Sequence, residues 1–151
     1  MQRYEIIITG RTKHFLSLVG EHLSVDNMNK AVKQVSEDLN VDIPEFTVAG
    51  VPHGLFFAHQ WWLACDDSVD ASLVRQKIDD KLKALNDDYA VERSSALKDI
   101  YLNILPESKF MDFMRAKGKI GGQHKFPRVM KGKMYEDWQR FLENGSIEKP
   151  A

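Results

Sequence analysis

Apolar residues recur at helical spacing in four stretches of the chain, which predicts four helices. Ser24 can cap the first helix, the run Asp66–Ser68 can cap the second, and Pro106 can introduce the third. Asn144 and Gly145 end the fourth helix. The apolar positions of the four stretches are Val25, Met28, Val32, Val35 and Leu39; Val74, Ile78, Leu82 and Leu85; Phe110, Met111 and Met114; and Tyr135, Trp138, Phe141 and Leu142.

Short runs rich in β-branched and aromatic residues lie before and between these helices, and they predict strands. Two of these runs are joined by a turn at 51–54 and predict a hairpin. A chain that mixes strands and helices in this way predicts an α+β fold, with a small mixed β-sheet and flanking helices. The predicted strands are residues 4–8, 15–18, 46–48, 55–64 and 100–104.

The length of the chain fits one domain. A chain of 151 residues can bury about 70% of the surface that it exposes when unfolded, which is enough for one core. Hydrophobic residues make up 43% of the chain and charged residues 28%, a composition that argues against a disordered or fibrous protein. We therefore expect a single domain at residues 1–143 and a fraying tail at 144–151.

Several classes of function are disfavoured by the same sequence. No apolar run approaches the roughly 20 residues that cross a bilayer, and no secretion signal opens the chain, so we expect a cytoplasmic protein without a membrane partner. Cys65 is the only cysteine, and we expect it to pack as a small apolar side chain. We expect Trp61 and Trp62 to pack in the core.

The histidines give no support for a metal site. Their positions do not form a zinc-binding pattern with Cys65, so turn and surface roles are expected for all five. They are His14, His22, His53, His59 and His124.

Positive charge is concentrated in one part of the chain. The net charge is only -1, which argues against a nucleic-acid partner, but no acidic residue lies between Asp112 and Glu136. That stretch includes a glycine-rich basic segment at 118–128, and a second such segment lies at 10–23. From spacing alone, a basic turn explains the segment at 10–23 and a surface loop explains the segment at 118–128. Neither segment has the pattern of a Walker phosphate-binding loop. The basic residues of the stretch are Arg115, Lys117, Lys119, Lys125, Arg128, Lys131 and Lys133, with His124.

The order and spacing of the two basic segments resemble a known enzyme family. The first segment resembles the hinge motif of the adenylate-forming superfamily, although lysine stands at 13 where many members have aspartate. Together with Leu85–Tyr89 and Gln123–Arg128, it is similar to the auxin-responsive Gretchen Hagen family of acyl-acid amido synthetases, especially its bacterial relatives. The similarity runs from about residue 4 to residue 141.

This resemblance implies a function and a set of roles. Members use ATP and magnesium to convert a carboxylic acid to an acyl-adenylate, and they then transfer the acyl group to an amino acid. The chain would be the C-terminal lid domain, whose partner is the large N-terminal domain that holds the ATP and the acid. The hinge would lie near 10–13. The resemblance implies that Lys13 is the hinge residue and that Arg11 and Gly10 bind the nucleotide. It also implies that Gly20 lines a tunnel used in the second step and that Lys125 is the catalytic lysine.

Two questions stay open at this stage. The first is which lysine is catalytic. Gly118-Lys119-Ile120 resembles the segment that holds the catalytic lysine in the wider superfamily, so Lys119 is an alternative. The neighbouring residues Gln123, Pro127 and Arg128 favour Lys125. The chain could also be the lid of an acyl-CoA synthetase, or a stand-alone binding or adaptor module that kept the fold without its chemistry. The acid and the amine acceptor cannot be read from this chain.

Overall fold

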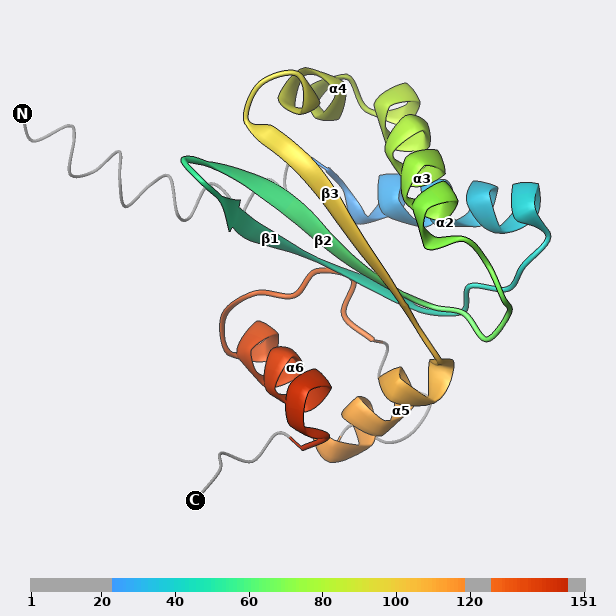
Figure 1. The fold of residues 1–151 in the computed structure, drawn as a ribbon, viewed down its shortest axis with the longest axis vertical. Coiled ribbons are helices and arrows are strands. Elements are labelled where there is room, and N and C mark those ends of the chain that lie inside the picture. The colour runs from blue at the N-terminus through green and yellow to red at the C-terminus, as the bar shows by residue number, and fades with distance from the viewer. Residues whose placement is uncertain (1–22, 119–125, 147–151) are drawn as a thin grey trace, which may run out of the picture.

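The computed structural model describes residues 23–118 and 126–146 (Figure 1). The strands predicted at 4–8 and 15–18 lie outside the described residues. Within them, an α+β domain forms as predicted. Its elements in chain order are α2 (Val25–Leu39), β1 (Phe46–His53), β2 (Phe56–Ala64), α3 (Ala71–Leu85), α4 (Asp87–Arg93), β3 (Leu97–Leu105), α5 (Glu107–Ala116) and α6 (Gly132–Asn144).

The three described strands form a mixed sheet with β2 in the middle. β1 and β2 pair antiparallel through the predicted hairpin, whereas β3 runs parallel to β2. A parallel pair needs a crossover connection, and α3 and α4 supply it. The register places Val48 beside Trp61, and Trp61 beside Leu102.

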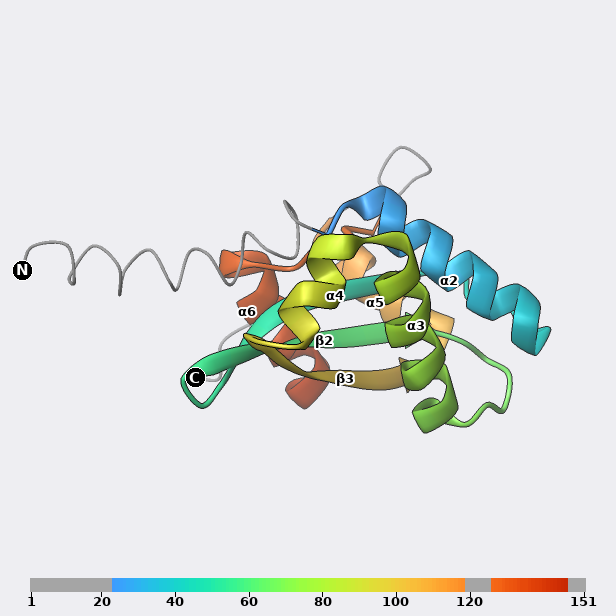
Figure 2. The same ribbon diagram turned by 90° about the horizontal axis from the view of Figure 1, so that it is seen from above.

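Helices lie on both sides of the sheet (Figure 2). The core accordingly forms two clusters, one on each face of the sheet. α2, α3 and α4 cover one face, and α5 and α6 cover the other (Figure 1). The single core expected from chain length is therefore split by the sheet. The first cluster includes Met28, Val32, Val35, Val48, Trp61, Ile78 and Leu82, and the second includes Ala49, Trp62, Phe110, Phe113, Phe126 and Trp138.

Two predicted boundaries were wrong. The turn of the hairpin is Gly54 and Leu55, because residues 51–53 still pair with β2. Gly54 has a positive φ of 62°, which glycine adopts without strain, and Leu55 is exposed in the turn. α3 begins after Asp70, whose carboxylate accepts a hydrogen bond from the Ser72 N–H, so the cap lies beyond Asp66–Ser68.

Two features of the helices were also missed. α4 was not predicted, although Asn86 caps it and Asp87 and Asp88 lie in its first turn. In α5 the buried face is formed by Phe110, Phe113 and Met114, and the predicted Met111 is exposed. The caps of α2 at Ser24 and of α6 at Gly145, together with burial of Cys65, Trp61 and Trp62, are confirmed.

Candidate functional site

The predicted catalytic and binding residues lie outside the described part of the chain. Gly10, Arg11, Lys13 and Gly20 belong to residues 1–22, and Lys119 and Lys125 belong to residues 119–125. Their roles therefore stay predictions. The structure does describe Gly118 and residues 126–128 of the second basic segment, on either side of residues 119–125, and the site can be built from them.

An ion pair holds the first end of this segment. Lys117 is the C-cap of α5, and its Nζ donates a hydrogen bond to Asp137 Oδ2 on α6 at 2.6 Å. Asp137 is only 3% exposed, so its carboxylate needs this partner. The hydrogen bond from Lys117 holds the pKa of Asp137 below its ordinary value. Gly118 follows with a φ of 74°, the left-handed geometry that ends a helix.

Aromatic packing holds the second end. Phe126 is buried on the face of the sheet that α5 and α6 cover. Its ring centroid lies 4.8 Å from that of Phe110, 5.2 Å from that of Trp138 and 5.9 Å from that of Phe113. These separations and the steep interplanar angles are those of favourable edge-to-face contacts.

The chain after Phe126 is tied to β1. Arg128 donates hydrogen bonds to Glu45 Oε1 at 2.8 Å and to the Phe46 carbonyl at 3.0 Å, and its guanidinium lies 4.2 Å from the Phe46 ring centroid. Val129 then forms a parallel bridge with Val48, in which the Val48 N–H donates to the Arg128 carbonyl at 2.9 Å. Arg128 therefore has a structural role beside its place in the motif.

Several cations of the basic stretch between Asp112 and Glu136 form ion pairs in the described part of the chain. Arg115 pairs with Asp112 at 3.0 Å, and Lys133 lies 3.5 Å from Asp137. With Lys117 and Arg128, four of its cations have carboxylate partners. The sequence pattern missed the partners of Lys117 and Arg128, because Asp137 and Glu45 are 20 and 83 positions away from them.

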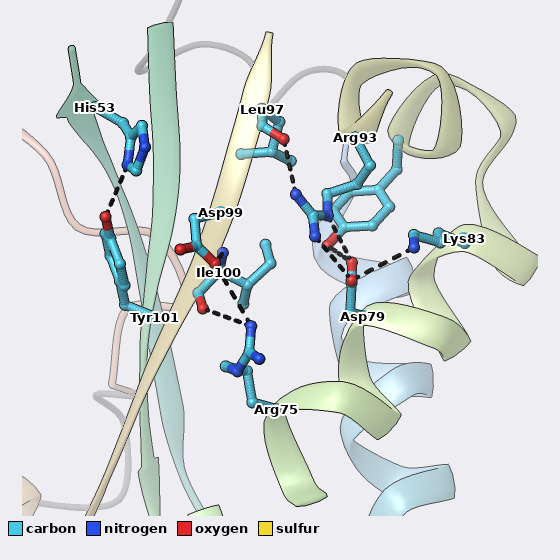
Figure 3. A network of polar contacts seen from close by, with 10 residues as sticks. His53, Arg75, Asp79, Lys83, Arg93, Leu97, Asp99, Ile100 and Tyr101 are labelled. Carbon is cyan, nitrogen blue, oxygen red and sulfur yellow. Dashed lines mark hydrogen bonds and ion pairs between the residues drawn. The ribbon is translucent and has the colours of Figure 1, made fainter. Parts of the chain in front are cut away.

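The Leu85–Tyr89 motif belongs to a polar network between α3, α4 and β3 (Figure 3). Asp79 accepts hydrogen bonds from the Tyr89 hydroxyl at 2.6 Å and from Arg93 Nε at 3.0 Å, and Arg93 Nη1 donates to the Leu97 carbonyl at 2.8 Å. Burial alone would raise the pKa of Asp79, but the hydrogen bonds from Arg93 and Tyr89 outweigh it and lower that pKa. The network thus joins three elements, and Tyr89 is the residue through which the motif takes part in it.

His59 contradicts the expectation that the histidines serve in turns and on the surface. It lies in β2, is 2% exposed, and packs between the rings of Phe57 and Tyr89. Burial, and secondarily the charge of Arg93, lower its pKa to about 3. The hollow beside it measures about 10 Å³, room for roughly one water molecule and far too little for a nucleotide.

The opposite face of the sheet carries two exposed polar contacts. His53 of β1 and Tyr101 of β3 meet across β2, with Nδ1 and the hydroxyl oxygen 2.8 Å apart (Figure 3). Gln60 Nε2 donates to Asn103 Oδ1 at 2.9 Å. His53 thus fits the expected surface role, whereas His14, His22 and His124 lie outside the described residues.

Metal and membrane sites were sought in residues 23–118 and 126–146. Within these ranges no group of three or more His, Cys, Asp or Glu side chains could hold a metal ion. No helix in the described ranges has both the length and the apolar character needed to cross a bilayer.

The chain matches the family model described as the GH3 family C-terminal domain over residues 26–134. It belongs to this family. The match includes the second basic segment, and it begins at residue 26, after the hinge motif at 10–13. Among curated proteins, none matches the chain.

Solved structures of the family share the fold. A GH3.15 acyl acid amido synthetase aligns with a TM-score of 0.62 and 16% identity, over 78% of this chain and 23% of that chain. A second structure, described as AtGH3.15 acyl acid amido synthetase in complex with 2,4-DB, gives a TM-score of 0.59 and 16% identity, over 83% of this chain and 25% of that one. This chain thus spans about a quarter of the length of these relatives.

Proposed function

We propose that this chain is the lid domain of an ATP-dependent acyl-acid amido synthetase, a cytoplasmic enzyme that activates a carboxylic acid and joins it to an amino acid. The observation that carries the proposal is the family match over residues 26–134, a span that contains the predicted lysine segment between two well-anchored ends. The similarity to solved amido synthetases supports the fold.

The chemistry proceeds in two steps. A carboxylate oxygen attacks the α-phosphorus of ATP, and pyrophosphate leaves. The amine nitrogen of an amino acid then attacks the acyl carbon, the bond to AMP breaks, and the nitrogen loses a proton. Lys125 would stabilise negative charge on the carboxylate and α-phosphate during the first step. Arg11 and Gly10 would approach the nucleotide, Lys13 would act as the hinge, and Gly20 would line the path of the amine.

The larger domain supplies the remainder of the site in this proposal. It would hold ATP, magnesium and the acyl acid, as the resemblance to the family implies. The domain described here would contribute a lysine to a site that it does not itself contain.

The lysine assignment is tested by pyrophosphate exchange. The enzyme with both domains is assayed with a panel of carboxylic acids, as wild type and as Lys125→Ala and Lys119→Ala. We expect Lys125→Ala to reduce exchange by at least 100-fold, because one charge-stabilising group in a transition state contributes about 10²–10³ in rate. Lys119→Ala should retain most of the activity. The reverse pattern would assign the role to Lys119.

One sequence feature favours a second function. Gly118-Lys119-Ile120 resembles the segment of the wider superfamily, in which acyl-CoA synthetases transfer the acyl group to a thiol. Supplying the enzyme with amino acids or with coenzyme A distinguishes an amide product from a thioester. If no acid supports exchange at all, an adaptor module becomes the better account.

A further inference from the structure

An open hollow of about 480 Å³ lies beside β3. This volume falls within the range of about 300–1,000 Å³ that small-molecule sites occupy. The side chains that line it are mostly polar and come from three elements. They are Gln60 of β2, Arg75 of α3, and Asp99, Tyr101 and Asn103 of β3. We propose that this hollow binds a purine nucleotide. It is separate from the site at which, in the function proposed above, a larger domain holds ATP.

Hydrogen bonds fix the orientation of two amide groups in the hollow. Gln60 Nε2 donates to the Trp61 carbonyl at 3.0 Å, a bond that only the nitrogen of the Gln60 amide can donate. The same nitrogen donates to Asn103 Oδ1 at 2.9 Å, so the other end of the Asn103 amide is its nitrogen. Within the described residues, Gln60 Oε1 and Asn103 Nδ2 have no hydrogen-bond partner. The hollow therefore offers one acceptor and one donor from neighbouring side chains.

This acceptor and donor suit the edge of a purine base. Adenine presents an amino donor beside a ring-nitrogen acceptor, and guanine presents a carbonyl acceptor beside a ring N–H donor. Either base can form two hydrogen bonds with the amides. Tyr101 is 37% exposed, and its hydroxyl oxygen lies 2.8 Å from His53 Nδ1, which holds the ring in place. The exposed ring can stack on the base, and a two-ring base covers more of it than a pyrimidine.

The other side of the hollow carries groups that suit a ribose and a phosphate. Arg75 points from α3 toward β3, and its Nη1 lies 3.5 Å from Asp99 Oδ1 and 3.3 Å from the Ile100 carbonyl (Figure 3). Its Nε and Nη2 have no partner among the described residues, and a guanidinium can bind two phosphate oxygens at once. Asp99 Oδ2 has no partner among these residues either, and it can accept from a ribose hydroxyl.

Calorimetric titration of the 151-residue chain tests for this site, with AMP, GMP and ribose 5-phosphate as probes. We expect ribose 5-phosphate to bind about 10-fold or more weakly than AMP, because it lacks the base and its two hydrogen bonds. Arg75→Met should weaken AMP binding by about 10-fold and leave adenosine binding within twofold, since adenosine has no phosphate. Thermal unfolding verifies that each variant is folded.

Asn103→Asp tests the base contacts directly. An aspartate keeps an acceptor for Gln60 Nε2 but replaces the free donor with a second acceptor. Two acceptors suit guanine, which carries a ring N–H and an amino group side by side, and they do not suit adenine. The ratio of GMP affinity to AMP affinity should therefore rise by about 10-fold or more. Asn29→Asp is the matched control, because it adds the same charge to an exposed position of α2 outside the hollow. It should leave the ratio unchanged.

Three results would overturn the assignment. The first is no binding of AMP or GMP at millimolar concentration, which would leave a solvated polar surface. The second is ribose 5-phosphate binding as tightly as AMP. The third is nucleotide binding that neither Arg75→Met nor Asn103→Asp changes, which would come from another part of the chain. Because the assay measures binding to this chain alone, none of these results decides whether the enzyme with both domains adenylates an acid.

Discussion

At the scale of single residues, burial sets the charge state of His59. Its imidazole is buried in β2 between two aromatic rings, so its pKa falls to about 3 and it is neutral in the folded state at neutral pH. The unfolded chain binds a proton at His59 below pH 6.5, whereas the folded chain does not until about pH 3. Stability must therefore fall as the pH drops from 6.5 toward 3.

We expect His59 to reduce the free energy of unfolding by about 2 kcal/mol between pH 7.5 and pH 5. His59→Leu removes the titrating group and leaves a side chain that suits the pocket, so this pH dependence should largely disappear. Urea unfolding of both proteins at the two pH values measures it. The same loss in the variant would show that another group is responsible.

The lowered pKa of Asp137 acts in a separate pH range. Its folded-state pKa is held below that of the unfolded chain by Lys117, so the stability that it contributes is present above about pH 4 and is lost at more acidic pH. The effects of His59 and Asp137 on stability can thus be distinguished, because each begins in a different pH range.

At the scale of elements, β3 lies at one edge of the sheet that the described residues form, and its polar backbone groups there are partly covered. The Ile100 N–H donates to Asp99 Oδ1 at 2.7 Å, and the Ile100 carbonyl accepts from Arg75 Nη1 at 3.3 Å (Figure 3). Both side chains block the position that the strand of another molecule would occupy. Edge strands without such protection pair readily with other chains.

The double variant Arg75→Ala, Asp99→Ala should therefore associate with itself more strongly than the wild type. Light scattering over a range of protein concentrations, with a thermal unfolding curve to confirm the fold, measures this. The control is Lys30→Ala with Asp26→Ala, which removes an exposed ion pair of α2 instead. Equal scattering by all three proteins would show that these side chains do not protect the edge.

Most elements were predictable because their signals are local. The spacing of Met28, Val32 and Val35 placed α2, and Ser24 marked its start. α4 was missed because its seven residues give too short a pattern, although Asn86 and the acids after it mark its first turn. The spacing of Phe110, Met111 and Met114 predicts a buried Met111, but Phe113 completes the buried face instead.

The candidate site was predictable only as a motif. Its residues were found by resemblance, and their placement stays a prediction. The contacts that anchor the segment could not be predicted, because they join residues far apart in the sequence: Lys117 and Asp137 are 20 positions apart, and Arg128 and Glu45 are 83 apart. Only a fold brings such partners together.

At the scale of the whole molecule, the chain spans about a quarter of its solved relatives. We expect the purified 151-residue chain to fold but to show no adenylation with ATP and any carboxylic acid. Circular dichroism and pyrophosphate exchange on the same sample test both statements. Measurable exchange by the isolated chain would contradict the proposal that a larger domain holds the ATP and the acid.

The division of the core has a consequence for how the protein is made. The helices on the first face precede β3 in the chain, whereas α5 and α6, which cover the second face, follow it. During synthesis the sheet can therefore close its first face while Ala49 and Trp62 still lack their partners. At typical elongation rates the remaining residues 106–146 take roughly 2–8 s to appear. For those seconds the second face is the part of the nascent chain most open to a chaperone.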